Sequence, residues 1–547
     1  MTVAPTRVVI LGGGFAGVAT ARQLLRHRRR DPAAAGLEVH LVNRENYMVF
    51  QPMLAEVLGG SVGPADTVTP LRRLLPGAHL HIRSIERVDL DAKTVTLAPA
   101  FRPQLHHLPY DHLVIALGNV TDFRGMRGLA EHAFPFKTLG DALVIRNHVI
   151  RVLEEASGES DREFRRQLLT FVVAGGGFSG VEAIAELHDF VRRSIRSHGL
   201  SAEDCRFVLL HSRDRILPEL APDLGEWAGR LLQKRGVDIL FNRRLAAATA
   251  NHALLDDGST IPTRTLISTV PSHPNPIVEA MDLPQDRGKL LAEATCRVQG
   301  QEAVWALGDC ALVPLATSDH GGKTEHAPPT AQHALRQASV CADNIVASLA
   351  QRPLRGFAFA GLGSLAALGH HKGVGQVMGI KISGFVAWVI WRSVYWSKLP
   401  GVYSKFRVGL SWLLHMLFPP DLTQLRLGQT QGVSQEHFEP GECVFEAGDL
   451  GDRVYIIVSG RAQVLRPGEA GGEPTVIAEL GPGQYFGEMA LLNHAPRSAT
   501  VRCTQAMDVL AIAKGDFEAL VGHLAELRAG FERTAAQRQE ESAGLLR

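Results

Sequence analysis

Residues 7–22 read RVVILGGGFAGVATAR: a short β-branched run, a cluster of glycines, and then the start of an apolar pattern with helical spacing. Glycines between a strand and a helix let the backbone N–H groups at the helix N-terminus approach a pyrophosphate. The spacing Gly12-x-Gly14-x-x-Gly17 is the one that such a turn uses. The stretch therefore predicts an α/β unit that binds a dinucleotide.

The same arrangement returns at residues 171–182, which read FVVAGGGFSGVE. Here a strand meets Gly175, Gly177 and Gly180 and again opens a helix. One fingerprint of this kind is weak evidence, because glycines also serve tight turns and close helix packing, but two copies in the required context are strong evidence. The sequence predicts an α/β protein with two Rossmann-type dinucleotide-binding domains.

The second strand of each unit usually ends near an acidic residue that bonds a ribose hydroxyl. Neither unit has one: Asn43 and Arg44 follow LEVHLV, and His211, Ser212 and Arg213 follow CRFVLL. The amide of Asn43 can still bond a hydroxyl, and the second trio suits a 2′-phosphate. In the alternative interpretation other groups hold the ribose and His211 is simply exposed. We expect these positions to contact the dinucleotides, and the choice between NADH and NADPH stays open.

A third motif, VWALGDCA at residues 304–311, ends a predicted buried strand with Gly308 and Asp309. This places a carboxylate at the carboxyl end of a strand, where ligands of open α/β sheets bind. The chain continues to PPTAQHALRQA at residues 328–338, where Thr330 can cap a helix that begins near Ala331. The positive field at that helix N-terminus favours an electron-rich ring nearby.

With these motifs, residues 1 to about 425 resemble the type II NAD(P)H:quinone oxidoreductases, the single-subunit alternative NADH dehydrogenases. The matching stretches, besides the second fingerprint, are LVNRENYMVFQPMLAEVLGGS, YDHLVIALGN, RILPEL, ALGDCA, PPTAQHALRQ and GLGSLAALGHHKGVG. The resemblance implies that FAD is held by the first fingerprint with Gly308, Asp309 and Ala331. It implies that NADH or NADPH is held by the second fingerprint.

The same resemblance implies catalytic roles for Glu182 and Gln332. The matching glutamate of the family lies beside flavin and nicotinamide and is implicated in proton-coupled transfer to quinone. The segment that contains Gln332 lies by the flavin and the quinone, so we assign Gln332 and Arg336 to the quinone pocket. The family usually has glutamine where Arg336 stands here, and Gln337 comes one place later.

The cysteines argue against a sulfide:quinone oxidoreductase, whose chemistry needs reactive thiols near the flavin. The six cysteines are spread widely, without a C-x-x-C pair, which also leaves no obvious zinc site. Cys310 follows Asp309 without a plausible partner, so we interpret it as a small residue after the turn.

Residues 344–420 contain no aspartate or glutamate. Four of the six tryptophans fall there, with the basic residues Arg352, Arg355, Lys372, Lys381, Arg392, Lys398, Lys405 and Arg407. The apolar runs at 382–391 and 408–418 are shorter than the roughly 20 residues that cross a bilayer. Basic and tryptophan residues beside such runs indicate helices that lie on an anionic lipid surface. The alternative is a helical hairpin that packs on a dimer partner, and the family resemblance favours the membrane and implies a homodimer.

A polar linker precedes a further domain, in which FEPGECVFEAGDLGDRVYIIVSGRAQV at residues 438–464 predicts a small antiparallel roll. Together with FGEMALLNHAPRSATV at residues 486–501, this part resembles the cyclic-nucleotide-binding domain across residues 430–540. The resemblance implies a phosphate cassette of Gly487, Glu488, Arg497 and Ser498, with Glu488 on the ribose and Arg497 on the cyclic phosphate. We expect cAMP rather than cGMP.

Composition sets the remaining expectations. The chain has 547 residues, a formal net charge of +1 and no basic excess, and about 30 residues after Phe517 are too few for a helix-turn-helix, so we expect no nucleic-acid partner. The N-terminus lacks a signal-peptide pattern, which favours a cytoplasmic protein, peripheral on the cytoplasmic face of the inner membrane.

We expect four parts: a FAD domain at residues 1–145 plus 278–345, an NAD(P)H domain at 146–277, a membrane-anchoring and quinone-access segment at 346–425, and a cyclic-nucleotide domain at 430–547. The predicted function is FAD-dependent, non-proton-pumping NAD(P)H:quinone oxidation–reduction, regulated by a cyclic nucleotide. The alternatives are a flavoprotein reductase of a soluble acceptor and a non-catalytic redox or nucleotide sensor.

Overall fold

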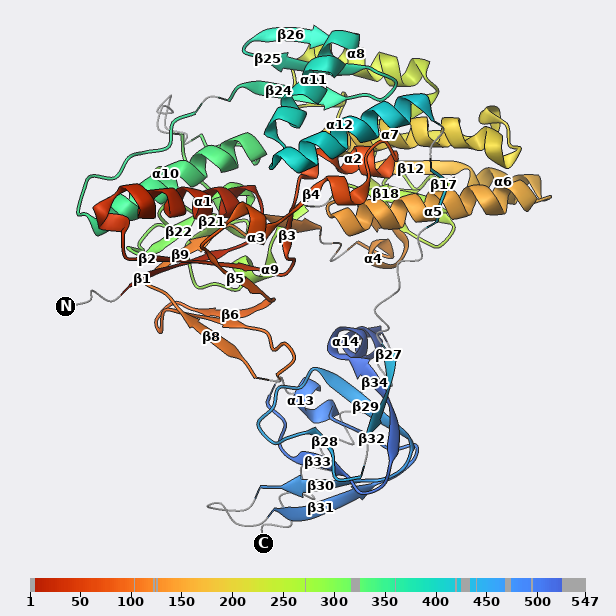
Figure 1. The fold of residues 1–547 in the computed structure, drawn as a ribbon. Coiled ribbons are helices and arrows are strands. Elements are labelled where there is room, and N and C mark those ends of the chain that lie inside the picture. Colours follow the sequence, from red (N-terminus) through yellow and green to blue (C-terminus); the bar gives the residue numbers. More distant parts are fainter. Residues whose placement is uncertain are drawn as a thin grey trace. The chain divides into compact units, whose positions relative to one another are not determined.

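The structure is a computed structural model, shown in Figure 1. It describes residues 5–102, 104–121, 123, 126–270, 272–315, 325–359, 361–418, 421–424, 433–438, 440–467, 474–492 and 495–523. The chain divides into two compact units. The first unit comprises Met1–Val95 and Pro109–Leu425, and the second comprises Thr96–Leu108 and Arg426–Arg547.

Two five-stranded parallel sheets form the centre of the first unit. The order of the first sheet is β22-β9-β1-β2-β5, with β1 (Thr6–Leu11), β2 (Leu37–Asn43), β5 (His79–Ile82), β9 (His112–Ile115) and β22 (Val304–Ala306). The order of the second is β11-β18-β12-β13-β14, with β11 (Phe134–Pro135), β12 (Thr170–Ala174), β13 (Arg206–His211), β14 (Val237–Phe241) and β18 (Thr265–Ser268). β12 thus occupies the position in its sheet that β1 occupies in the first, which confirms the two Rossmann-type units.

The central strands are apolar along their length because helices and loops cover both faces of each sheet. Val8, Val9, Ile10 and Leu11 of β1 are fully buried, as are Phe171, Val172 and Val173 of β12.

Helices pack against these sheets. In the first part of the unit, α1 (Phe15–Arg30) lies against α10 (Ala331–Leu349), although the two are far apart in the sequence. In the second part, α2 (Leu54–Leu58) packs against α5 (Leu139–Gly158) and α7 (Phe178–Ser194). Thr138 begins α5 with a capping box, since its hydroxyl accepts from the Asp141 N–H and the Asp141 carboxylate accepts from the Thr138 N–H. The remaining short helices include α3 (Leu71–Leu74), α4 (Leu129–His132), α6 (Arg162–Leu168), α8 (Pro222–Lys234) and α9 (Pro276–Glu279).

Short strands complete the first part of the chain. Their bounds are β3 (Tyr47–Val49), β4 (Val68–Pro70), β6 (Ile85–Asp89), β7 (Thr94–Leu97), β8 (His106–Pro109), β10 (Asn119–Thr121), β15 (Leu245–Ala248), β16 (His252–Leu255), β17 (Thr260–Pro262), β19 (Ser272–Pro274), β20 (Gln285–Asp286), β21 (Lys289–Leu291) and β23 (Ala311–Leu312).

The segment after α10 contains an antiparallel sheet that the sequence did not predict. Its strands are β24 (Gly363–Ala367), β25 (Gly373–Val377) and β26 (Ile380–Ser383), followed by α11 (Gly384–Lys398) and α12 (Val402–Leu417). The expected apolar helix from Ile382 is wrong at its start, because Ile382 lies in β26 and pairs with Gly375 of β25. Trp391 of α11 is buried against Leu365 and Ala367 of β24, which holds the helix on the sheet.

The second unit contains a roll of two four-stranded antiparallel sheets, β27-β34-β29-β32 and β28-β33-β30-β31. The element bounds are β27 (Val433–Phe438), β28 (Cys443–Phe445), β29 (Arg453–Ser459), β30 (Ala462–Arg466), β31 (Thr475–Leu480), β32 (Tyr485–Phe486), α13 (Glu488–Leu492), β33 (Thr500–Cys503), β34 (Met507–Ala513) and α14 (Lys514–His523). A core that includes Tyr455, Ile457, Phe486 and Val509 closes the roll. This confirms the predicted all-β roll with short helices.

Candidate active site

The first fingerprint turn requires glycine for steric reasons. Gly12 has φ +108°, and a Cβ atom there would lie 2.3 Å from the Ala116 carbonyl oxygen. A Cβ atom on Gly17 would lie 1.9 Å from the carbonyl oxygen of Gly12. Gly14, by contrast, has open space beside it and begins α1 without a side-chain cap. The first N–H groups of α1 are therefore available to a pyrophosphate.

The second fingerprint repeats this geometry. Gly175 has φ +118°, and a Cβ atom on Gly180 would lie 1.8 Å from the Gly175 carbonyl oxygen. Gly177 begins α7 without a side-chain cap, and the nearest atom to a Cβ there is a Glu219 carboxylate oxygen at 3.5 Å. The second helix N-terminus is thus open in the same way as the first.

The residue that ends the second strand supports the glycine turn in both units. The N–H of Gly13 donates to Asn43 Oδ1 at 2.8 Å, and Asn43 Nδ2 donates to the Glu45 carbonyl oxygen at 2.7 Å. In the other unit the N–H of Gly176 donates to His211 Nδ1 at 3.1 Å.

This geometry corrects one interpretation of the sequence. His211 is buried, not exposed, and burial together with the charge of Arg213 lowers the pKa of its imidazole. Neutral His211 positions the turn, whereas Ser212 and Arg213 are exposed at the end of β13. Arg44 is also exposed and pairs with the Glu45 carboxylate at 3.5 Å.

The Gly308–Asp309 turn is held by a residue that the sequence analysis did not assign to a site. Gln337 of α10 is buried, and its Oε1 accepts from the Gly308 N–H at 2.9 Å. The carboxylate of Asp309 is half-buried and accepts no hydrogen bond from the described residues. The sequence contained one sign of this role. The glutamine that the family usually has at position 336 stands here at position 337, and a shift of one residue turns a side chain toward another face of the helix.

α10 begins at Ala331, after Thr330. The expected side-chain cap is absent, because Thr330 Oγ1 pairs with His333 Nδ1 at 2.7 Å instead. The first N–H groups of α10 therefore stay available, as they do in α1. The hydrogen-bonding groups in this region fit FAD. They are the uncapped N-termini of α1 and α10, the turn at Gly12 with its positive φ, and the carboxylate of Asp309.

Gln332 and Arg336 lie on the first turns of α10, beside the start of β24. The Gln332 amide donates to the Gly363 carbonyl oxygen at 3.2 Å and accepts from the Leu362 N–H at 3.1 Å. Arg336 donates to the Gln332 carbonyl oxygen at 3.0 Å and lies 3.8 Å from the centre of the Phe359 ring. The structure thus brings these two predicted residues together.

Glu182 lies near the start of α7, where the second fingerprint meets the β24–α11 segment. Its Oε1 accepts from the Ala367 N–H at 2.9 Å and from Trp391 Nε1 at 3.2 Å. Burial raises the pKa of Glu182 to about 8, against the opposing effect of these two hydrogen bonds. A carboxyl group with this pKa can hold and release a proton near neutral pH.

The cysteines near the first sheet are structural. Cys310 is buried, its thiol lies 3.4 Å from the Leu307 carbonyl oxygen, and burial raises its pKa to about 11. No disulfide joins any of the six cysteines. A raised thiol pKa leaves little thiolate, the reactive form, at neutral pH.

The predicted cassette in the second unit is compact around Arg497, which is 4% exposed. Its guanidinium donates to the carbonyl oxygens of Gly487 and Arg453 and lies 4.1 Å from the Phe445 ring centre. Gly487 has φ +89°, and Glu488, also buried, begins α13. Ser498 is exposed beside Arg497. Residues 493 and 494 of the cassette lie outside the described residues.

Comparisons with known proteins agree with this geometry. The family model for pyridine nucleotide-disulphide oxidoreductases matches residues 6–338, the NDH2 C-terminal domain matches residues 362–421, and the cyclic nucleotide-binding domain matches residues 435–523.

Curated relatives match most of the chain. A demethylphylloquinone reductase of Synechocystis sp. is 30% identical over 426 residues, covering 76% of this chain and 98% of that protein. A type II NADH:quinone oxidoreductase of Mycobacterium tuberculosis is 28% identical over 452 residues, covering 79% and 91%. An internal alternative NAD(P)H-ubiquinone oxidoreductase of Arabidopsis thaliana mitochondria is also 28% identical over 452 residues, covering 77% and 86%.

Among solved structures, NDH2 from Plasmodium falciparum in complex with NADH has the same fold, with a TM-score of 0.70 at 17% identity over 76% of this chain and 99% of that chain. The chain therefore belongs to the pyridine nucleotide-disulphide oxidoreductase family, within its type II NADH dehydrogenase group, and carries an additional cyclic nucleotide-binding domain.

Proposed function

We propose that the protein is an FAD-dependent enzyme that oxidises NADH or NADPH and reduces a membrane quinone. The observation that carries this proposal is Glu182, a carboxyl group whose pKa is raised to about 8, set between the second fingerprint and the NDH2 C-terminal domain. Bound FAD would supply the redox chemistry, taking a hydride from the nicotinamide and passing two electrons to the quinone.

The fingerprint glycines, Asp309 and Ala331 bind and orient the flavin in this proposal. Gly12, Gly14 and Gly17 leave the first N–H groups of α1 open for the pyrophosphate, and the uncapped N-terminus of α10 would favour the electron-rich flavin. Gly175, Gly177 and Gly180 present α7 to the pyrophosphate of NAD(P)H in the same way.

Glu182 exchanges a proton during quinone reduction. Its Oε1 accepts both hydrogen bonds, from Ala367 and Trp391, so the proton resides on Oε2. Because burial favours the neutral form of the carboxyl group, Glu182 can donate that proton while the quinone is reduced.

Gln332 and Arg336 shape the quinone side of the site. The Gln332 amide is fixed to the start of β24, and Arg336 is stacked on Phe359, so both side chains are held before a quinone binds. Fixed polar groups in a mostly apolar surround orient a ligand of this kind.

The cofactor preference follows from the end of β13. Ser212 and Arg213 are exposed there, and a guanidinium suits a 2′-phosphate. We expect the enzyme to oxidise NADPH at least comparably to NADH.

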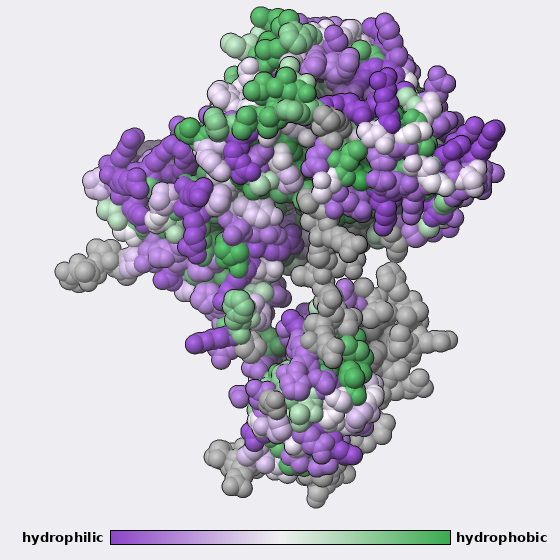
Figure 2. Space-filling view, turned by 45° about the vertical axis from the view of Figure 1, so that its right-hand side comes forward, coloured by the Kyte–Doolittle hydropathy of each residue, from purple (hydrophilic) through white to green (hydrophobic). Residues whose placement is uncertain are grey.

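Attachment to an anionic lipid surface is proposed for α11 and α12. Figure 2 shows apolar residues gathered at the top of the view, where these helices lie. The exposed large apolar side chains of the two helices are Phe385, Val386, Val389, Trp396, Val402, Tyr403, Phe406, Leu410, Leu413, Leu414, Met416 and Leu417. Among the described residues no helix is long and apolar enough to span a bilayer.

The residues 344–420 offer less unpaired positive charge to a lipid surface than their sequence indicates. Five of their eight basic side chains form ion pairs: Arg352 with Asp31, Arg355 with Asp343, Lys381 with Asp223, Arg392 with Glu56, and Arg407 with Asp66. The other three, Lys372, Lys398 and Lys405, form no ion pair with described residues and can therefore interact with anionic lipid headgroups. Apolar contact is the larger contribution to attachment. A homodimer that covers part of this surface is the alternative, and attachment to the cytoplasmic face of the inner membrane stays a prediction.

Regulation by a cyclic nucleotide, cAMP before cGMP, is proposed for the second unit. Glu488 would accept from the ribose and Arg497, with Ser498, would pair with the cyclic phosphate. If the enzyme has a more active and a less active state, a cyclic nucleotide that binds one state more tightly increases the population of that state. The size of the change in activity is set by the difference between the ligand's affinities for the two states.

The test of the function follows the two half-reactions. The purified protein should show a flavin absorption spectrum that NADH or NADPH bleaches and that a quinone restores. Recovery with a soluble electron-transfer protein but with no quinone would favour the soluble-acceptor reductase. Bleaching without recovery by any acceptor would favour the redox sensor.

A further inference from the structure

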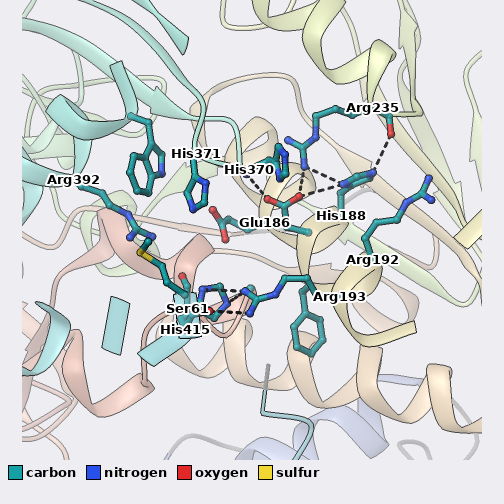
Figure 3. A pocket seen from close by; sticks show the side chains of 16 residues that line it. Ser61, Glu186, His188, Arg192, Arg193, Arg235, His370, His371, Arg392 and His415 are labelled. Atoms are coloured by element: carbon teal, nitrogen blue, oxygen red, sulfur yellow. Dashed lines mark hydrogen bonds and ion pairs between the residues drawn. The ribbon is translucent and has the colours of Figure 1, made fainter. Parts of the chain in front are cut away.

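A cavity of about 750 Å³ lies among the residues that follow α2, the helices α7, α11 and α12, and the turn between β24 and β25. Figure 3 shows its lining, in which four arginines and four histidines surround Glu186. His370, His371 and Met416 are exposed at its edge, so the cavity reaches solvent.

Most charged groups of this cavity have partners. Arg235 pairs with Asp189 and bonds His188, Arg193 bonds the ring and carbonyl oxygen of His415, and Arg392 pairs with Glu56 at 3.1 Å. Glu186 differs, because its carboxyl group has no hydrogen bond or ion pair with the described residues. It is a titratable group that points into the cavity (Figure 3).

Glu186 lines the cavity and lies near Glu182. The two residues are four apart on α7, and side chains at this spacing are neighbours on one helix face. Glu186 Oε2 also lies so close to Gly59 that a Cβ atom there would approach it to 2.5 Å, so the carboxyl group is pressed between α7 and the end of α2.

Several charged groups face Glu186 from the surrounding elements. They are Glu56 of α2, Glu182, Asp189 and Arg193 of α7, Arg392 of α11, His415 of α12, Arg235 before β14, and His370 and His371 of the β24–β25 turn. Burial, and then the carboxylates of Glu56 and Asp189, raise the pKa of Glu186 well above its usual range, against the charge of Arg392. This environment favours the protonated form of the Glu186 carboxyl group.

The proposed reaction consumes one proton from solvent for each quinone that is reduced. In the balance NAD(P)H + H⁺ + quinone → NAD(P)⁺ + quinol, the nicotinamide supplies two electrons and one proton, and solvent supplies the second proton. Ala367 and Trp391 occupy Oε1 of Glu182, and a proton that Glu182 gives to the quinone has to be replaced before the next turnover.

We propose that Glu186 is a proton relay that carries the solvent proton from this cavity to Glu182. Glu186 gives its proton to the Glu182 carboxylate and takes another from the cavity, so both carboxyl groups return to their starting state. This relay rests on the proposed quinone reductase activity. Glu186 is a positioning and relay residue, because it touches neither cofactor nor quinone.

The test compares Glu186→Gln with the wild-type enzyme in the two half-reactions, by stopped-flow absorption of the flavin. Bleaching by NADH should be unchanged, and reoxidation by quinone should slow by roughly 10- to 100-fold, because a positioned proton donor contributes at least that much. Proton transfer should then limit the rate, so the solvent deuterium isotope effect on reoxidation should increase.

The matched control is Glu226→Gln, which makes the same change at an exposed site on α8. A second variant, Glu186→Ala, separates relay from structure: formate should enter the cavity and restore reoxidation in a concentration-dependent way. Equal reoxidation in wild type and Glu186→Gln, or a loss that responds neither to formate nor to deuterium, would overturn the relay. If the wild-type enzyme reduces no quinone, the proposed function fails first, and the relay fails with it.

Discussion

The N–H of Gly176 donates to His211 Nδ1 at 3.1 Å, and this bond ties the second fingerprint to the end of β13. The first unit makes the same connection with a different residue, from Gly13 to Asn43 at 2.8 Å. A histidine and an amide thus perform one task, because each offers an acceptor at the same place and burial keeps the imidazole neutral.

This relationship predicts that binding of NADH and NADPH depends on a hydrogen-bond acceptor at position 211 and does not require an imidazole there. His211→Asn should keep the KM for NADH and NADPH close to the wild-type value. His211→Leu leaves the Gly176 N–H without its acceptor and should raise both KM values by about 3- to 10-fold, the usual effect of one neutral hydrogen bond. Bound FAD, measured by its absorption, should be retained in both variants. Equal behaviour of the Asn and Leu variants would contradict this role.

Arg213 should select for NADPH. Its guanidinium is exposed beside the fingerprint, so Arg213→Ala should raise the KM for NADPH by roughly tenfold, consistent with a lost charge-assisted bond, and leave the KM for NADH nearly unchanged. Arg230→Ala on α8, which removes an exposed arginine, is the control. Steady-state kinetics with both cofactors decide the question, and an equal loss for NADH and NADPH would refute the assignment.

Glu182 should impose a pH limit on quinone reduction. Its pKa is raised to about 8, so the protonated form that donates is present below this pH and is lost as the pH rises through it. Reoxidation of the flavin by quinone should therefore decline above pH 8, while bleaching by NADH should not. Glu182→Gln should slow reoxidation at every pH and remove this decline.

Trp391→Phe provides the matched control for this assignment. The indole N–H favours the ionised form of Glu182, so its loss should raise the pKa of the carboxyl group and move the decline to higher pH. A decline that stays at the same pH in Trp391→Phe and in Glu182→Gln would belong to another group.

Arg497 should be needed for cyclic-nucleotide binding and dispensable for electron transfer. Calorimetry of Arg497→Leu should show no binding of cAMP, because the cyclic phosphate loses its charge-assisted bonds. Its flavin spectrum and bleaching by NADH should match the wild type. Arg502→Leu, on the exposed side of β33, should bind normally. Since Arg497 also bonds two backbone carbonyl oxygens, thermal unfolding must show that the roll remains folded. If the wild-type protein binds neither cAMP nor cGMP, the regulatory proposal is refuted.

Attachment to lipid should depend on exposed apolar side chains of α12. Phe406 and Leu413 are 69% and 53% exposed, and each large apolar side chain contributes about 1.5–3 kcal/mol when buried. The double change Phe406→Ser and Leu413→Ser should lower partitioning to anionic liposomes by about tenfold or more in a flotation assay. Phe101→Ser removes an exposed phenylalanine outside this segment and should have no effect. Unchanged flotation, with loss of a dimer, would assign the surface to a second copy.

The sequence alone determined the parts of this protein whose requirements are local. A strand followed by a glycine turn and a helix allows few alternatives, because Gly12 and Gly175 must adopt positive φ and Gly17 and Gly180 leave no room for a Cβ atom. Short β-branched runs between glycine turns predicted the roll, because strand propensity and turn formation also depend on residues close together in the sequence. These features could be predicted because each depends on neighbours within a few residues.

The tertiary structure decided everything that depends on which distant segments meet. Ile382 joins β26 because β25 is there to pair with it, which an apolar run cannot reveal. Gln337 reaches Gly308, and Arg392 neutralises Glu56, only after the chain has folded. The raised pKa of Glu186 arises in the same way, from burial and from the carboxylates of Glu56 and Asp189, which the fold brings near it.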